Sequence, residues 1–264
     1  MTHARLLSGA PNEDLFGFAQ AVRAGPLVHV SGQVGKDNRT GAMVAESGLA
    51  PRLARTLRNV RDSAEGLGGP GTRLVALDVY LAVDPAAERE TIAAALETAS
   101  GGDAPATTLV AVEALASPDY LVEISATAVA GEEAAVQLVQ DGSPLERAIG
   151  GSQAVRVGSH VYVAGQLSVD DDGALVPGSV AEQLDRALAR FLDVLARAGA
   201  RESDVVATTI AIAEPQDRAG FAAICDVHRA VFGEAKPSAT LVFVPALPLD
   251  GATAQVSGIA VVDG

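Results

Sequence analysis

The chain repeats itself at a nearly constant distance. The phrase "LVHVSGQVG", residues 27–35, returns as "VYVAGQLSV", residues 161–169. Other matched residues are separated by 131 to 133 positions: Gln33 and Gln166, Gly68 and Gly199, Pro105 and Pro237, Leu115 and Leu247. A constant offset over a chain of 264 residues indicates two copies of one complete domain, because short solenoid repeats recur at much smaller periods. Ser31 of the first phrase is Ala164 in the second, so the copies differ in their polar groups.

Each copy is expected to be an α+β domain. Strand-like runs turn at Gly25 and at Gly158, and a helical pattern follows in both halves. Apolar residues spaced by three and four place one face of each helix against a core: Leu53, Leu57, Val60, Ala64 and Leu67, then Leu184, Leu188, Phe191 and Leu195. Ser179 and Glu182 suit a capping box, and Gly68 and Gly199 suit left-handed helix ends. We predict domains at 1–131 and 150–264, with 132–149 as a linker.

One-sided helices predict a sheet with two helices on one face in each domain. The strands are apolar on both faces, so the uncovered face should be buried against another domain or subunit.

Composition limits the partners and the compartment. The formal net charge of −14 repels phosphate, and no cluster of Lys and Arg makes a local exception, so neither nucleic acid nor an anionic membrane is an expected partner. The single cysteine excludes an internal disulfide. No stretch has the pattern of a signal peptide or of a membrane span, which predicts a cytoplasmic protein. Neither a metal nor another cofactor is expected, since "DDDG" at 170–173 lacks the ligand spacing of a calcium loop.

At this level of detail the chain resembles the RidA/YjgF family. The similarity rests on "SGQ" at 31–33, the helix that ends in glycine, "PA" at 105–106 and "VEISATAVA" from Val122, and it covers about 16–130 and 151–262. The resemblance implies a six-stranded mixed sheet in each domain, assembly into trimers, and ligand clefts between neighbouring subunits. It also implies hydrolysis of reactive imines and enamines, with an arginine that holds the substrate carboxylate and a glutamate, a serine and a tyrosine beside the substrate.

The family's site residues are only partly present. Ser31 and Glu123 match the family serine and glutamate, Phe18 stands in place of the tyrosine, and Thr107 stands in place of the arginine. In the second half none of the four positions is kept: Gly151, Ala164, Ala239 and Gln255. Without the arginine, the substrate either lacks such a carboxylate or meets an arginine from elsewhere, for which Arg23, Arg147 and Arg156 are candidates.

We therefore expect one partial site, with Glu123 and Ser31 as catalytic residues. Phe18, Thr107, His29 and Cys225 are the candidate substrate-binding residues. Plainer interpretations remain open for each of these residues. Glu123 could be an interface carboxylate, Ser31 could bond only to backbone, and His29 could be structural. Cys225 with His228, one helical turn later, could form a thiolate–imidazole pair or simply pack.

The leading hypothesis is a non-canonical Rid-type enzyme in a dedicated metabolic or biosynthetic pathway. It would act by acid–base chemistry on an imine, an enamine or a related carbonyl intermediate, as a hydrolase, deaminase, cyclase or isomerase. The alternative is an inactive small-molecule-binding or scaffold protein of the same fold. Ribonuclease activity is disfavoured by the negative charge. A homo-oligomer is expected, with a trimer favoured.

Overall fold

The computed structural model describes residues 3–100, 102–131 and 135–262. Within these residues the first half of the chain forms a six-stranded sheet with the strand order β1-β2-β3-β6-β4-β5. Its elements are β1 (Ala4–Leu6), α1 (Pro11–Phe16), β2 (Ala21–Ala24), β3 (Leu27–Val34), α2 (Leu49–Gly68), β4 (Arg73–Leu81), α3 (Arg89–Ser100), β5 (Ala106–Ala111) and β6 (Val122–Val129). Only β4 and β5 pair in parallel, with α3 as their crossover, so the sheet is mixed.

The second half repeats this topology, with the strand order β7-β8-β9-β12-β10-β11. Its elements are β7 (Val136–Val139), α4 (Pro144–Ile149), β8 (Ala154–Val157), β9 (His160–Leu167), α5 (Val180–Arg197), the 3-10 turn η1 (Glu202–Asp204), β10 (Val205–Ile212), α6 (Arg218–Phe232), β11 (Ser238–Phe243) and β12 (Ala254–Val261). Even the irregularities recur, because the β4–β6 ladder shifts between Leu74 and Ala76 and the β10–β12 ladder shifts between Val205 and Ala207. The predicted α+β class with a six-stranded mixed sheet in each half is confirmed.

The described part of the segment predicted as a linker, residues 135–149, contains a strand and a helix. β7 pairs antiparallel with β8 and becomes the outer strand of the second sheet, while α4 packs against α3 of the first half. Val136 and Leu138 alternate with Gln137 and pack against the cluster between the halves, which explains why this stretch is a strand. The second sheet therefore begins before residue 150, where the sequence analysis places the domain boundary.

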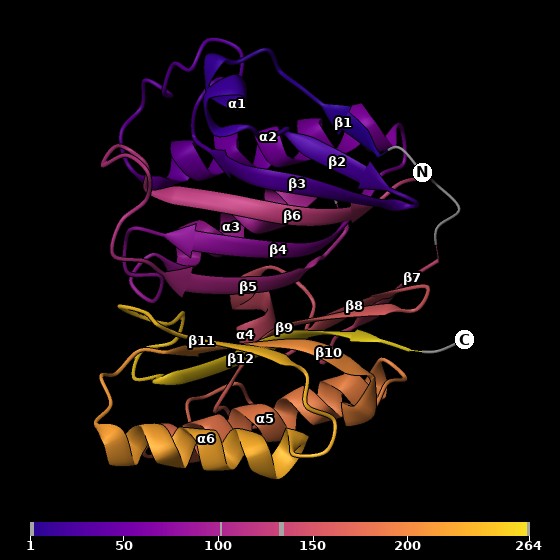
Figure 1. Cartoon of the computed structure of the whole chain (residues 1–264). Coiled ribbons are helices and arrows are strands. Elements are labelled where there is room, and N and C mark those ends of the chain that lie inside the picture. Colours follow the sequence, from indigo (N-terminus) through magenta and orange to yellow (C-terminus); the bar gives the residue numbers. More distant parts are fainter. Residues whose placement is uncertain (1–2, 101, 132–134, 263–264) are drawn as a thin grey trace.

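Each sheet has its helices on one face, as Figure 1 shows for α5 and α6 beneath the second sheet. Four apolar side chains of α2 and four of α5 are buried at the positions expected from their spacing: Leu53, Leu57, Val60 and Ala64, then Leu184, Leu188, Phe191 and Leu195. Ser179 caps α5 through the predicted box with Glu182. Gly199 has the expected positive φ, but Gly68 is the last residue of α2 and Gly69 is the left-handed one.

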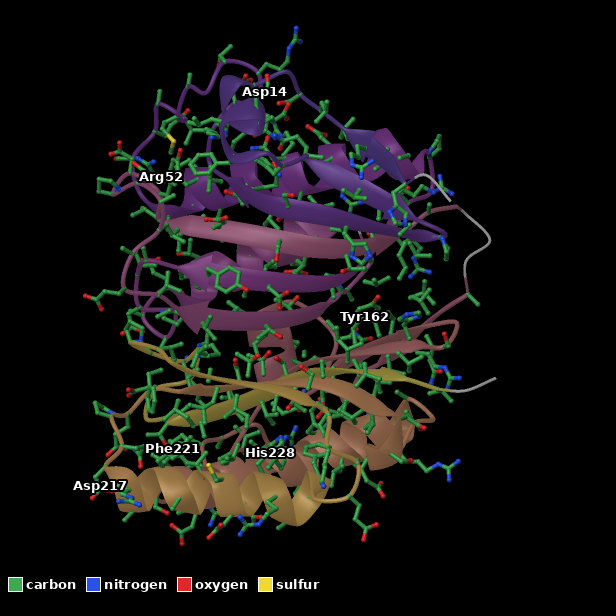
Figure 2. All side chains as sticks on the ribbon, in the orientation of Figure 1. Asp14, Arg52, Tyr162, Asp217, Phe221 and His228 are labelled. Carbon is green, nitrogen blue, oxygen red and sulfur yellow. The ribbon has the colours of Figure 1, made fainter. Side chains whose placement is uncertain are left out.

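The two halves meet along β5 of the first sheet and β9 of the second (Figure 1). An apolar cluster fills the junction: Val75, Ala106, Val129, Val155, Val157, Tyr162 and Ala164. Tyr162 lies between the halves in Figure 2, and burial raises its pKa to about 12. Backbone groups pair across the junction, since the Ser152 N–H donates to the Pro105 carbonyl at 3.0 Å. The uncovered sheet face is thus partly buried as predicted, whereas Tyr80 on the same face is exposed.

Candidate functional site

An open cleft of about 700 Å³ lies in the first half, and all of its lining residues come from that half. Its walls come from α1 and the residues after it, from the end of β3 and the following turn, and from the start of β6. The lining includes Phe18, Ser31, Gly32, Lys36, Tyr120 and Glu123. The structure thus brings together three of the predicted site residues, namely Phe18, Ser31 and Glu123.

Glu123 lies on the sheet face opposite the helices. Its neighbours Val122 and Ile124 are buried beneath the helices, so strand alternation turns the half-buried Glu123 towards the cleft. In the described part of the chain, no hydrogen bond to the Glu123 carboxylate is formed. Burial raises the pKa of Glu123 above its usual value, and the nearby Lys36 ammonium partly opposes this rise. The raised pKa makes this carboxyl group a candidate for accepting and returning a proton.

Gly32 lies directly under the Glu123 carboxylate. A Cβ atom on Gly32 would approach Glu123 Oε1 to 2.0 Å, so only glycine permits this position of the carboxylate. This contact gives the glycine of the "SGQ" phrase a role that the sequence alone does not reveal.

Ser31 is half-buried and donates its hydroxyl proton to the Ala19 carbonyl at 2.7 Å. Its oxygen keeps lone pairs that can accept a hydrogen bond from a ligand. Both interpretations of Ser31 therefore hold in part, because the side chain is bonded to backbone and also lines the cleft.

A buried polar network fixes the floor of the cleft. Gln20 Nε2 donates to Glu13 at 2.7 Å, and Gln33 Nε2 donates to Gln20 at 3.1 Å. Asn38 Nδ2 then donates to Gln33 Oε1 at 2.7 Å. The Glu13 carboxylate also accepts from Ser8 and from the Gly9 N–H, and these hydrogen bonds, working against its desolvation, lower the pKa of Glu13. Because these side chains satisfy one another, they hold the loop around the cleft in one conformation.

Lys36 and Tyr120 were not identified from the sequence, yet both line the cleft beside Glu123. Lys36 Nζ lies 5.8 Å from the centre of the Tyr120 ring. The position of Lys36 just after the "SGQ" phrase, and of Tyr120 just before the Glu123 strand, is the sequence signal that points to them.

The corresponding pocket in the second half is almost closed, with a volume of about 30 Å³. Its residues correspond to the cleft at an offset of 133, for example Gly151 to Phe18 and Ala164 to Ser31. Here β5 of the first half packs across the opening. A Cβ on Gly151 would approach the Pro105 carbonyl oxygen to 2.4 Å and Thr107 Oγ1 to 2.7 Å. An aromatic ring at position 151 is therefore incompatible with this junction.

Comparison with known proteins agrees with this doubled architecture. The family model described as Endoribonuclease L-PSP matches residues 11–130 and again residues 146–262. The chain belongs to this family. The match confirms the RidA/YjgF resemblance drawn from the sequence, and it covers both halves.

Relatives of this family member match between 38% and 48% of its length. A RutC family protein of Pyrococcus abyssi is 38% identical over 100 residues, which are 38% of this chain and 76% of that protein. The 2-iminobutanoate/2-iminopropanoate deaminase of Capra hircus is 37% identical over 111 residues, covering 42% of this chain and 78% of that protein. A crystal structure of a YjgF/YER057c/UK114 family protein from Mycobacterium tuberculosis is 34% identical, with a TM-score of 0.42, over 48% of this chain and all of that chain.

The family arginine has no replacement among the arginines considered from the sequence. Arg23 donates to the Gly25 carbonyl, Arg147 to the Gly142 carbonyl, and Arg156 to three backbone carbonyls. None of these side chains lines the cleft. Thr107 is buried in the junction and donates to the Pro105 carbonyl at 3.1 Å, so it lines the closed pocket and not the open one.

Two further candidates are placed outside the cleft. His29 is exposed on β3 and is not among the residues that line it. Cys225 lies on α6, in the helical layer of the second half, whereas Glu123 lies on β6 of the first sheet (Figure 1). His228, labelled in Figure 2, contacts Thr208 Oγ1 at 3.2 Å and the Phe232 ring, and burial lowers its pKa. These are packing contacts of the helix and not a thiolate–imidazole arrangement.

In the described ranges, no group of three or more His, Cys, Asp or Glu residues is placed to hold a metal ion. Over the same ranges, none of the helices has the length and apolar character needed to cross a bilayer.

Proposed function

We propose that this family member hydrolyses a reactive imine or enamine in the Glu123 cleft. The observation that carries the proposal is the Glu123 carboxyl group, which is half-buried, has a raised pKa and opens into the cleft without a bonding partner in the described chain. Its similarity to 2-iminobutanoate/2-iminopropanoate deaminases supports an imine as the substrate class.

The chemistry needs one group that accepts and returns a proton. In the addition step Glu123 takes a proton from water, the water oxygen bonds to the imine carbon, and the proton passes to the nitrogen. In the second step Glu123 takes the hydroxyl proton of the carbinolamine and delivers it to nitrogen. The C–N bond then breaks, and a carbonyl compound and ammonia leave with Glu123 restored.

Ser31 and Phe18 would hold the substrate during these steps. The Ser31 oxygen can accept a hydrogen bond from the imine or enamine nitrogen, while the half-buried Phe18 ring offers an apolar wall. The rate of both steps would depend on the position of Glu123 and on its protonation state.

One cleft per chain is proposed to be active. Gln255 replaces the acid in the second half, and the pocket beside it is closed by the junction. This loss of polar groups also supports the alternative function, in which the protein binds a small molecule without turnover. Ribonuclease activity, although it is in the family description, is disfavoured by the net charge of −14.

The test is the release of ammonia from imines generated in place by an amino-acid oxidase. We expect turnover with the wild type, none with Glu123→Gln, and wild-type turnover with Glu90→Gln, which makes the same chemical change on the exposed surface of α3. If no imine from a broad amino-acid panel is hydrolysed while small molecules still bind, the binding alternative holds.

A further inference from the structure

We propose that Lys36 takes over the task of the missing family arginine and binds a carboxylate of the substrate. The substrate class would then be an anionic imine or enamine whose charged group lies at the Lys36 side of the cleft. This inference rests on the proposed function for the site, but it concerns a different residue and a different measurable property.

The first argument is charge. Among the described residues that line the cleft, Lys36 is the one cation and Glu123 the one anion. In the described chain no carboxylate lies within the 4.0 Å of an ion pair from Lys36 Nζ, and no hydrogen bond from that atom is formed. A half-buried ammonium group with three unused donors is a site for an acceptor that the protein itself does not supply.

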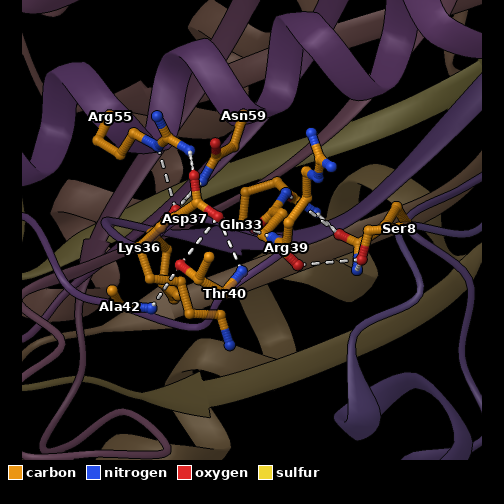
Figure 3. A network of polar contacts seen from close by, with 12 residues as sticks. Ser8, Gln33, Lys36, Asp37, Arg39, Thr40, Ala42, Arg55 and Asn59 are labelled. Carbon is orange, nitrogen blue, oxygen red and sulfur yellow. Dashed lines mark hydrogen bonds and ion pairs between the residues drawn. The ribbon is translucent and has the colours of Figure 1, made fainter.

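The second argument is position. The Lys36 backbone is held firmly, because its carbonyl accepts from Asn59 Nδ2 at 2.8 Å and from Arg55 Nε at 3.2 Å. Figure 3 shows these contacts together with the Asp37 turn, in which the carboxylate accepts from the Thr40 N–H. The side chain extends from this anchored base, and its ammonium lies near the Tyr120 ring, 5.8 Å from the ring centre. A cation held this way is preorganised for an anionic ligand.

The third argument is the comparison of the two halves. Position 36 corresponds to Val169, which is buried in an apolar cluster of the second half. The half that has lost the glutamate and the serine therefore also lacks the lysine. At this position the cation is present only in the first half, and the arginine beside the closed pocket of the second half, Arg190, comes from α5 instead.

Lys36 would bind a carboxylate with a different geometry from that of an arginine. A lysine ammonium is a point charge and cannot form the paired hydrogen bonds of a guanidinium, so the carboxylate would be held with less control of its orientation. Lys36 lies on the turn after β3, whereas Thr107 lies in the junction on β5, so the two positions belong to different elements of the fold.

The experiment compares two probes of nearly equal shape, 2-oxobutanoate and its neutral amide 2-oxobutanamide, by calorimetric or NMR titration at low salt. The wild type is expected to bind the acid about tenfold or more tightly than the amide, as for a charge-assisted hydrogen bond. Lys36→Met should bring the two affinities within about twofold of each other, whereas Lys36→Arg should keep the preference. Arg39→Met, which removes an exposed cation from the same turn, is the matched control and should also keep it.

Equal binding of acid and amide by the wild type would overturn the inference, as would an unchanged preference in Lys36→Met. These results are independent of turnover. An absence of ammonia release with a retained acid preference refutes the proposed reaction and leaves Lys36 as an anion-binding residue. Turnover without a preference for the acid supports the proposed reaction and refutes the role of Lys36 as an anion-binding residue.

Discussion

The Glu123 carboxylate lies directly against Gly32. A Cβ atom added to that glycine would be only 2.0 Å from Glu123 Oε1. The same contact recurs in the second half, where Gln255 lies over Gly165 and a Cβ would approach its amide carbon to 2.5 Å. This contact between a glycine and the facing side chain has therefore been kept in both halves, while the acid has been kept in only one.

This relationship predicts that Gly32→Ala abolishes turnover without unfolding the protein. The methyl group would push aside the end of a flexible side chain, so the carboxylate should leave its position while the sheet stays intact. Ammonia release and the melting temperature, measured on the same preparation, check both parts. Gly165→Ala is the matched control. It should lower stability by about 1–3 kcal/mol through overpacking and leave turnover per folded molecule unchanged. Full turnover in Gly32→Ala would contradict the assigned position of Glu123.

A second prediction concerns simple substrates. Because Thr107 and Ala239 stand where the family has arginine, 2-iminopropanoate should be hydrolysed far more slowly than by the deaminases to which the chain is similar. A coupled ammonia assay run beside one of those deaminases decides the point. Rapid ammonia release from 2-iminopropanoate would show that the bidentate clamp is dispensable here.

The pH dependence of the turnover rate should reveal the ionisation of Glu123 and its electrostatic coupling to Lys36. Glu123 acts as a base only when ionised, and burial raises its pKa, so the acidic limb of the rate profile should lie above the usual range of a glutamate. The Lys36 charge lowers this pKa. Lys36→Met should therefore move the limb to higher pH, and Lys36→Arg should not. A limb that stays in place in Lys36→Met would show that the two groups are not electrostatically coupled.

The stability of the protein should also depend on the pKa of Glu123, but here the protonated form of the carboxyl group is the favourable one. A carboxyl group with a raised pKa in the fold favours the protonated state, so its contribution is present below the unfolded pKa and is lost as pH rises through the folded pKa. Glu123→Gln lacks this titration. Its stability relative to the wild type should improve across that window, which urea unfolding at several pH values would measure. A pH-independent difference would argue against the raised pKa.

Features that depend on local sequence patterns could be predicted. The repeated phrase, the spacing of Leu53 and Leu57 and the alternation around Glu123 each translate into one local geometry. The sequence could not predict what depends on long-range packing. That Thr107 is buried against Gly151 follows from how the two halves meet, and Lys36 joins the cleft only because the turn after β3 folds back towards Tyr120. Within the segment predicted as a linker, β7 is stabilised by pairing with β8, a contact made only in the folded sheet and not visible in the local sequence.

The last prediction concerns assembly, for which the junction inside the chain provides a template. There the edge of β5 lies against β9, and the Gly165 N–H donates to Thr108 Oγ1 at 3.1 Å. Of the counterparts of these residues, Thr240 lies on the free edge strand β11, and Gly32 lies on the interior strand β3, where it is exposed beside the cleft. β11 is largely exposed, and 54% of Phe243 at its end is accessible to solvent.

An exposed strand edge with apolar side chains favours pairing with another chain. We therefore expect β11 of one copy to dock beside Gly32 on β3 of a second copy, as β5 docks on β9 within the chain, and to close the open side of the Glu123 cleft. The protein should be a homo-oligomer, with a trimer favoured.

Light scattering should give a mass above the 26.7 kDa of one chain. Thr240→Lys should lower that mass and weaken turnover together, because the cleft would lose its neighbour. Ala222→Lys, on the exposed surface of α6, should change neither. A wild-type mass of 26.7 kDa at micromolar concentration would refute the assembly, and full turnover by that monomer would show that the cleft works without a partner.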